Sequence, residues 1–312
     1  MLNNPPRSFP PPSFLIMSIY SLWGALEIGL IFGLVALGVL ISFRILRFPD
    51  LTVDGSFPLG GATAAILISV GLDPFTATLA AMGAGAFAGM ITGWLNVKLR
   101  IMDLLASILM MIALYSINLR IMGGPNVPLI MEPTVFTILQ PSGLTDYVFR
   151  PLLLVVLLVV VKLLLDWYFS TQAGLAMRAT GSNPRMARAQ GVATGRRVLV
   201  GMAISNALCA LAGALFAQSQ GGADISMGIG TIVIGLAAVI IGESIMPSRR
   251  FFIITLAVII GAVLYRFFVA LALNADFIGL HAQDLNLVTA LLVTFALVMP
   301  LIKQRLRGRK GG

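Results

Sequence analysis

Apolar runs of about 20 residues recur along nearly the whole of this 312-residue chain. An α-helix of that length crosses roughly 30 Å of hydrocarbon. Only 11% of the residues are charged, whereas soluble domains carry roughly 25%. The sequence therefore predicts an all-α integral membrane protein, a helical bundle of about nine spans. The predicted spans are residues 18–43, 57–72, 76–98, 101–120, 150–168, 198–219, 230–246, 251–272 and 285–302.

The segment from Thr171 to Arg197 is a polar island between two predicted spans, with five arginines and no acidic residue. Because Lys and Arg are enriched in cytoplasmic loops, we place this island in the cytoplasm. The other Lys/Arg clusters agree with one orientation, in which the N-terminus lies outside. We expect a membrane domain over 18–302 that contains this cytoplasmic loop (171–197). A disordered, Pro-rich extension (1–17) precedes it, and a basic cytoplasmic tail (303–312) follows.

Several classes of function have no support in the residues. The net charge of +9 comes largely from the island and the tail, without interleaved aromatic side chains, so no nucleic-acid partner is expected. One cysteine excludes an internal disulfide, and no metal-ligand spacing is present, so we expect neither a metal nor a cofactor. The sequence contains no catalytic constellation and no phosphate-binding lysine loop. We therefore predict that the chain is not an enzyme.

Small residues recur every four positions in two of the predicted spans. The third span contains Ala81, Gly85, Gly89 and Gly93, and the sixth contains Gly201, Ser205, Cys209, Gly213 and Ala217. Such stripes allow helix backbones to approach closely in a membrane. We expect a compact bundle, in which Cys209 is a packing residue rather than a redox group.

Two segments depart from regular helix. Arg47–Gly61 contains two prolines and two aspartates at the entry to the second span. A half-helix that begins near Ser56 would direct its N-terminal dipole into a cavity, as in transporters. A tight cytoplasmic turn in which Asp54 caps the next helix fits equally well. In Ala217–Gly235, glycines and an aspartate interrupt the apolar run on the outer side, which fits a short gate helix or a re-entrant turn.

Ionisable residues inside membrane spans are candidates for function. Glu27 is the clearest case, roughly a third of the way into the first span. Glu243 and Arg266 lie near span ends, where we expect them to act as interfacial anchors. The predicted transport-path residues are Glu27, Asp54, Ser56 and Asp224.

One stretch of the island resembles the coupling segment of permease subunits in bacterial ABC importers: Met177–Val192, MRATGSNPRMARAQGV. The family is that of the branched-chain amino acid and ribose-type permeases. Three further stretches are most similar to its tryptophan/tyrosine permease subfamily: FRILRFPDLTVDGSFPLGGA, ILMMIALYSINLRIMGGPNVPL and GADISMGIGTIVIGLAAVIIGE. The resemblance and the basic island together indicate ATPase-coupling residues, namely Arg178, Gly181, Asn183, Pro184, Arg185, Arg188 and Gly191.

The resemblance also implies a type II importer fold of the vitamin B12 permease kind, embedded in the lipid of the bacterial inner membrane. Two copies of the chain would form the pore, each docked on one ABC ATPase subunit. A substrate-binding protein would deliver a small solute, with an amino acid expected and an aromatic one favoured. The alternative is an ion-coupled secondary transporter. Such a transporter would usually need several buried carboxylates, and Glu27 is the only residue that supports this alternative.

Overall fold

The computed structural model describes residues 19–141, 145–248 and 250–273, together with residues 290, 291, 294 and 298. The predicted extension (1–17), the predicted tail (303–312) and nearly all of the ninth span lie outside the described residues. The described elements, in chain order, are α1 (Ile19–Val39), the π-helix η1 (Leu40–Ile45), α2 (Thr52–Ser69), α3 (Pro74–Val97), α4 (Asp103–Met122), β1 (Asn126–Pro128), α5 (Val135–Leu139), α6 (Asp146–Ser170), α7 (Gln172–Ser182), α8 (Pro184–Ala189), α9 (Thr194–Gln220), β2 (Gly222–Asp224), the 3-10 helix η2 (Ile225–Gly228), α10 (Thr231–Ile245) and α11 (Phe251–Leu273).

The membrane-spanning helical bundle predicted from the apolar runs is confirmed. Among the described residues, seven helices are long and apolar enough to cross a membrane. The second predicted span is occupied by α2, which is less apolar because Asp54, Ser56 and several glycines lie within it. α2 also begins earlier than the predicted residue 57. The reason is that Asp50 Oδ1 accepts a hydrogen bond from the Thr52 N–H (3.0 Å), which satisfies a donor at the helix start.

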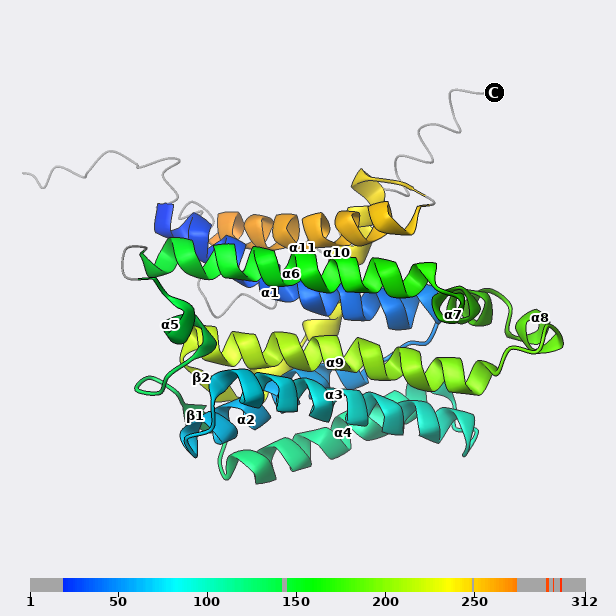
Figure 1. The fold of residues 1–312 in the computed structure, drawn as a ribbon, viewed down its shortest axis with the longest axis horizontal. Helices are drawn as coiled ribbons and strands as arrows, with labels where there is room; N and C mark the ends of the chain where they lie inside the picture. The colour runs from blue at the N-terminus through cyan, green and yellow to red at the C-terminus, as the bar shows by residue number, and fades with distance from the viewer. Residues whose placement is uncertain are drawn as a thin grey trace, which may run out of the picture.

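α9 lies at the centre of the bundle, where it packs against α1, α2 and α3. In Figure 1, α1, α6, α10 and α11 lie above α9, and α2, α3 and α4 lie below it. The largest apolar core surrounds α1 and η1, which are buried from Gly29 to Ser42. This burial explains why the first span is apolar on all sides.

The two small-residue stripes bring helices into close contact, as predicted. A side chain at Gly85 or Gly89 of α3 would overlap the backbone of α9 at Asn206 or Met202. Gly213 of α9 likewise lies against the backbone of α2. Cys209 is fully buried and its Sγ lies against Gly38 of α1, as expected of a packing residue.

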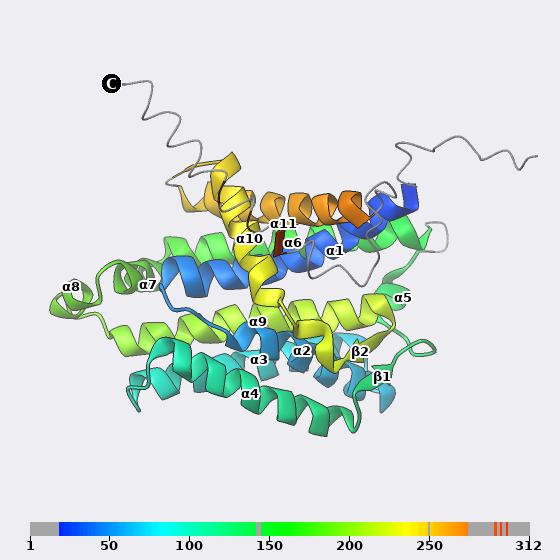
Figure 2. The ribbon, with the colours of Figure 1, turned by 180° about the vertical axis from the view of Figure 1, so that it is seen from behind.

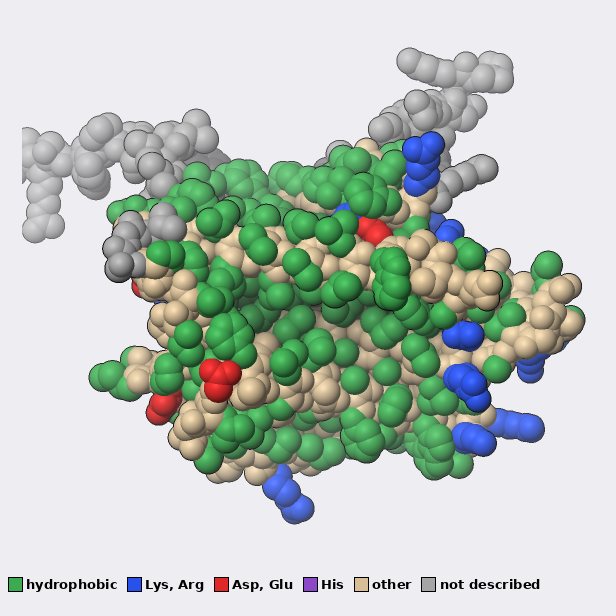
Figure 3. Space-filling view, viewed as in Figure 1, with side chains coloured by type: hydrophobic (Ala, Val, Ile, Leu, Met, Phe, Trp, Pro, Cys, Tyr) green, Lys and Arg blue, Asp and Glu red, His purple; other side chains and the backbone are tan. Residues whose placement is uncertain are grey.

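The two ends of the bundle differ in chemistry. One end carries α7 and α8, and Lys and Arg side chains gather there (Figure 3). The opposite end carries α5 and a two-stranded antiparallel sheet, in which Val127 of β1 pairs with Ala223 of β2. The positive-inside rule predicts that the α7–α8 end faces the cytoplasm and that the sheet lies outside; we name the two ends accordingly.

Two helices begin inside the bundle rather than at one of its ends. After η1 the chain turns back into the bundle before α2 starts, and α10 also begins between the two ends (Figure 2). The short helix η2 precedes α10, which confirms the departure from a continuous span predicted for residues 217–235. Gly230, between η2 and α10, has a φ of +81°, a conformation that glycine adopts without a steric penalty.

Candidate transport and coupling sites

Asp54 lies in the first turn of α2, and its carboxylate joins the starts of two helices. Its Oδ1 accepts a 2.7 Å hydrogen bond from the Ile232 N–H in the first turn of α10. Pro58 cannot donate to the Asp54 carbonyl, and that carbonyl lies against Gly228 at the end of η2. The N-termini of α2 and α10 therefore converge on one carboxylate, which both helix dipoles favour. The alternative prediction, in which Asp54 caps the start of α2, is wrong. Asp50, and not Asp54, accepts a hydrogen bond from the Thr52 N–H at that start.

Five fully buried polar side chains form a network between α2, α3 and α9, which we call the Asp50 cluster: Asp50, Thr52, Ser56, Thr92 and Asn206. Asn206 Nδ2 donates to Asp50 Oδ2 (2.8 Å), and Asn206 Oδ1 accepts from Ser56 Oγ (2.7 Å). The hydroxyls of Thr52 and Thr92 lie 2.9 Å apart. Within the described ranges, no cationic side chain forms an ion pair with Asp50. Neutral amide and hydroxyl groups therefore replace the hydration of this carboxylate.

The Asp50 cluster fixes the position of Ser56, whose hydroxyl is buried and bonded between α2 and α9. Sequence reasoning selected Ser56 but missed Asn206 and Thr92. A signal was available for Asn206, because it is the only amide side chain between residues 198 and 217, a stretch that is apolar apart from Ser205 and Asn206. Polar side chains in such stretches hydrogen-bond across membrane helices.

The other two predicted transport-path residues lie toward the outer end. Glu27 is half-buried in α1 and accepts a 2.5 Å hydrogen bond from Ser219 Oγ near the end of α9. Asp224 ends β2 and caps η2, where it accepts hydrogen bonds from the Ser226 N–H (2.7 Å) and the Ser226 hydroxyl. The structure thus places Asp54 and Ser56 on the same helix, and Glu27 and Asp224 in separate contacts nearer the outside.

The predicted cytoplasmic loop contains two short helices, α7 and α8, at the cytoplasmic end of the bundle (Figures 1 and 2). Asn183 precedes α8, and its Oδ1 accepts a hydrogen bond from the Met186 N–H (3.0 Å), while Pro184 opens the helix. A side chain on Gly181 would overlap the Ile45 carbonyl. α7 therefore lies directly against the end of η1.

Three arginines of this loop point away from the core. Arg178, Arg185 and Arg188 are all exposed. The Arg178 guanidinium lies 5.8 Å from the centre of the Phe251 ring at the start of α11. Gly191, just after α8, has a left-handed φ of +79°, which suits a helix end at glycine. A defined backbone that presents outward cationic side chains is suited to docking on an acidic protein surface.

Sequence reasoning missed a buried ion pair inside a span. Lys162 Nζ and Asp166 Oδ2 of α6 lie 2.5 Å apart, with side chains only 5% and 12% exposed. Thr255 Oγ1 of α11 donates to Asp166 Oδ1 (2.8 Å), and Lys162 Nζ lies 3.1 Å from the centre of the Phe252 ring. The signal was the i,i+4 spacing of Lys and Asp in an otherwise apolar stretch, which puts both on one helix face. The pair ties α6 to α11.

The two predicted interfacial anchors differ in their surroundings. Glu243 fits the prediction, because it forms a 2.7 Å ion pair with Arg44 at the cytoplasmic end and both side chains are partly exposed. Arg266 does not fit the prediction of an interfacial anchor. Its guanidinium lies 5.1 Å from the centre of the Phe32 ring, and its buried Nε has no hydrogen-bond partner in the described part of the chain. The side chain turns inward because Gly29 allows α11 to approach α1 closely.

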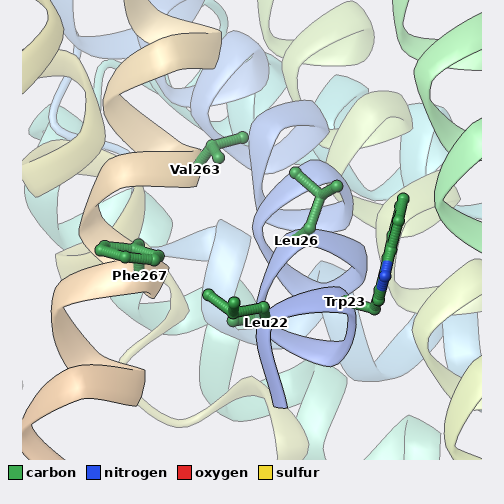
Figure 4. A pocket seen from close by; sticks show the side chains of 6 residues that line it. Leu22, Trp23, Leu26, Val263 and Phe267 are labelled. Carbon is green, nitrogen blue, oxygen red and sulfur yellow. The ribbon is translucent and has the colours of Figure 1, made fainter. Parts of the chain in front are cut away.

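An apolar pocket of about 390 Å³ lies between α1 and α11 near the outer end (Figure 4). It is lined by Leu22, Trp23, Ala25, Leu26, Val263 and Phe267. None of these side chains is charged, and none is a predicted transport-path residue. The pocket therefore lacks the groups that would orient a charged solute such as an amino acid.

A multi-span bundle with a basic, helical cytoplasmic loop is the architecture expected of the membrane subunit of a transporter. Residues 22–299 match the family described as "Branched-chain amino acid transport system / permease component", and the chain belongs to this family of ABC transporter permeases. The protein is therefore a multi-pass inner-membrane transporter subunit and not an enzyme. Membership of this family implies an ATPase and a substrate-binding protein as partners.

Three relatives illustrate the range of this family. The tyrosine transport system permease protein of Clostridioides difficile is 38% identical over 265 residues, which cover 85% of this chain and 86% of the relative. The ribose import permease protein of Escherichia coli K12 is 24% identical over 262 residues, 82% of this chain and 78% of the relative. The galactofuranose transporter permease protein of the same strain is 29% identical over 209 residues, 65% of this chain and 58% of the relative.

Proposed function

We propose that this permease is the membrane subunit of an ATP-driven importer for a small solute, namely an amino acid, with an aromatic one favoured. A separate ATPase supplies the energy, and a substrate-binding protein delivers the solute from outside. Two copies of the chain form the pore, with α2, α4 and α10 contributing to its cavity. The observation that carries the substrate proposal is the 38% identity, over 85% of this chain, to a relative named for tyrosine transport. An ion-coupled secondary transporter belongs to a different class from the family that the chain matches.

In this proposal the ATPase docks on α7 and α8 through Arg178, Arg185 and Arg188. Gly181, Asn183, Pro184 and Gly191 shape the loop that presents these arginines. Charge-assisted hydrogen bonds from arginine to carboxylates of the ATPase would fix the position of this loop.

The contacts of α7 provide a physical route from the ATPase to the interior. Gly181 of α7 lies against the Ile45 carbonyl, and Leu46 packs beside Met177 at Gly201 of α9. A displacement of α7 would therefore act on Ile45 and Leu46. From these residues the chain enters the bundle and continues to the Asp50 cluster. From there Asp54 connects α2 to the start of α10. ATP binding would shift the population between two arrangements of these packed elements.

We place the transport path beside the convergent starts of α2 and α10. The Asp54 carboxylate is half-buried there and suits an ammonium group, while N–H groups at helix starts suit a carboxylate. An amino acid carries both charges. Ser56 lies on the same helix as Asp54, and Glu27 and Asp224 lie on the outer side, where solute would enter. Separation of α2 from α10 would open this site.

The experiment that tests the proposal is uptake into vesicles that contain the assembled permease, ATPase and binding protein. We expect ATP-dependent uptake of labelled tyrosine that unlabelled tryptophan or phenylalanine reduces and ribose does not. At equal expression, Asp54→Asn and Ser56→Ala should lower this uptake. If the two residues are only structural, uptake stays at the wild-type level, and Asp54→Asn weakens only the cap of α10, at a cost of about 1 kcal/mol of stability. Uptake driven by an ion gradient without ATP would contradict the importer assignment.

A further inference from the structure

A hollow of about 160 Å³ opens at the cytoplasmic end, where η1, α7 and the start of α11 meet. Three arginines line it, Arg44, Arg47 and Arg178. The hydroxyl-bearing residue Ser182 lines it as well. This set of donors from separate elements matches what an anion requires, because arginine binds phosphate oxygens with paired N–H groups.

Two of these arginines have no acidic partner among the residues that the structure describes. Arg44 already forms an ion pair with Glu243 (2.7 Å). Within the described residues, neither Arg47 nor Arg178 forms an ion pair, although Arg178 lies 5.8 Å from the centre of the Phe251 ring. The hollow therefore holds two positive charges that nothing described in this chain neutralises.

The backbone holds Arg47 in an unfavourable conformation at this hollow. Its φ is +55°, in the left-handed region that L-residues with a side chain rarely adopt. The neighbours on both sides, Leu46 and Phe48, are buried, and their N–H groups bond to the carbonyls of Ile41 and Ser42. Because the chain is anchored on both sides, Arg47 is directed to the surface. Such strain persists where the surrounding structure determines it and often marks a functional site.

The other walls of the hollow are apolar. Leu40, Ile45, Phe251 and Ile254 line it. Phe251 begins a membrane-spanning helix, so the hollow lies at the level where the cytoplasmic leaflet has its headgroups. Phe252, the next residue, is 54% exposed and extends the apolar surface along α11. A small soluble anion would not use these walls, whereas an amphiphile would.

We propose that this hollow binds the phosphate of an anionic phospholipid from the cytoplasmic leaflet, with Arg47 and Arg178 as its main ligands and the acyl chains along α11. Basic pockets beside membrane helices on the cytoplasmic side are suited to such headgroups. Because Arg47 follows η1 and Arg178 belongs to α7, the bound lipid would bridge the coupling loop to the end of the first span. The proposal does not depend on which solute the permease carries. It assigns Arg178 to the lipid, so the surface proposed for the ATPase would rest on Arg185 and Arg188, which are exposed on α8.

The test uses the purified permease in a neutral detergent. Phosphatidylglycerol is titrated against phosphatidylcholine, and binding is followed by native mass spectrometry and by the rise in Tm. We expect saturable binding of phosphatidylglycerol that the double variant Arg47→Gln, Arg178→Gln weakens by about thirtyfold. Arg100→Gln is the matched control, because Arg100 also lies at the cytoplasmic end, is exposed and has a left-handed φ (+56°), but it does not line the hollow.

The double variant Arg47→Lys, Arg178→Lys keeps the charge but loses the paired N–H groups of arginine, so its binding should lie between that of the wild type and that of the Gln variant, which separates a lost ligand from a misfolded protein. Three results would overturn the proposal. They are equal stabilisation by phosphatidylcholine, an equal rise in Tm with inorganic phosphate alone, and unchanged phosphatidylglycerol binding by the Gln variant. If that variant binds the lipid normally but no longer binds the ATPase, the two arginines belong to the subunit interface and the lipid site is wrong.

Discussion

The Asp50 carboxylate sits fully buried in the bundle, and its hydrogen bonds must replace the water that it lost. Asn206 of α9 is hydrogen-bonded both to Asp50, in the segment that precedes α2, and to Ser56 within α2. It therefore joins these three parts of the chain. Removal of one partner from a buried network leaves the others without hydrogen bonds, which costs more than the bond itself contributes. The stability of this region therefore depends on an amide that the sequence presents as an ordinary polar residue.

We predict that Asn206→Ala lowers the free energy of unfolding by about 1–3 kcal/mol, because Asp50 and Ser56 each lose a hydrogen-bond partner. Urea unfolding in detergent, followed by tryptophan fluorescence, measures the change. Thr63→Val is the control, since Thr63 Oγ1 is buried and has no partner in the described part of the chain. Equal stabilities of the two variants would show that the Asp50 cluster contributes nothing specific.

The ion pair of Lys162 and Asp166 leads to a second prediction at this scale. Lys162→Met leaves the Asp166 carboxylate without its cation inside a span, which we expect to cost about 3–5 kcal/mol. The double variant Lys162→Met, Asp166→Leu removes both charges and should recover most of this loss. Thermal unfolding of the single and double variants, in one detergent, provides the comparison. A double variant as unstable as the single one would show that the pair itself, rather than charge compensation, stabilises the contact of α6 with α11.

Helix packing in this bundle depends on where small residues face. Gly89 and Gly83 both belong to α3, but Gly89 lies against the Met202 carbonyl of α9, whereas nothing lies near Gly83. We predict that Gly89→Ala destabilises the protein by about 1–3 kcal/mol through overpacking. Gly83→Ala should be neutral or stabilise by up to about 1 kcal/mol, because alanine favours helix. The difference in Tm between the variants tests whether this stripe, and not glycine in general, brings α3 and α9 together.

The elements that sequence reasoning predicted well are those with a local signal. Each small-residue stripe repeats within a single helix, one in α3 and the other in α9. The interruptions of regular helix near Asp54 and Gly230 are marked by prolines and glycines. The contacts that it missed join distant parts of the chain. The carboxylate of Asp54 bonds to Ile232, 178 positions away, and Asn206 bonds to Asp50, 156 positions away. Helix periodicity shows which face of one helix is polar, but it does not show which other helix lies opposite.

At the scale of the whole molecule, the described contacts form one connected path from the cytoplasmic surface to the interior. The path runs from α7 through residues 45 and 46 to the Asp50 cluster, and then through Asp54 to α10. Neighbouring elements along this path are packed, hydrogen-bonded or joined by the chain itself, so we expect a displacement of α7 to be transmitted toward α10. An ATPase that moves α7 and α8 in two copies of the chain would therefore act on both halves of the pore together.

In the proposed coupling loop, charge can be reversed without a change in the core, because the arginines of α8 are exposed. Arg185 and Arg188 are exposed on α8, and neither forms an ion pair within the described residues. We predict that Arg185→Glu, Arg188→Glu leaves membrane insertion and Tm unchanged but reduces transport by at least about tenfold. The physical reason is that glutamates repel the acidic groups with which the arginines would pair. Lys98→Glu, Arg100→Glu reverses two charges at the same end of the bundle, outside the loop, and serves as the control. The measurement is ATP hydrolysis stimulated by the loaded binding protein, in parallel with uptake. Normal stimulation in the α8 variant would exclude α8 as the coupling element, and equal losses in both variants would point to a general effect of cytoplasmic charge.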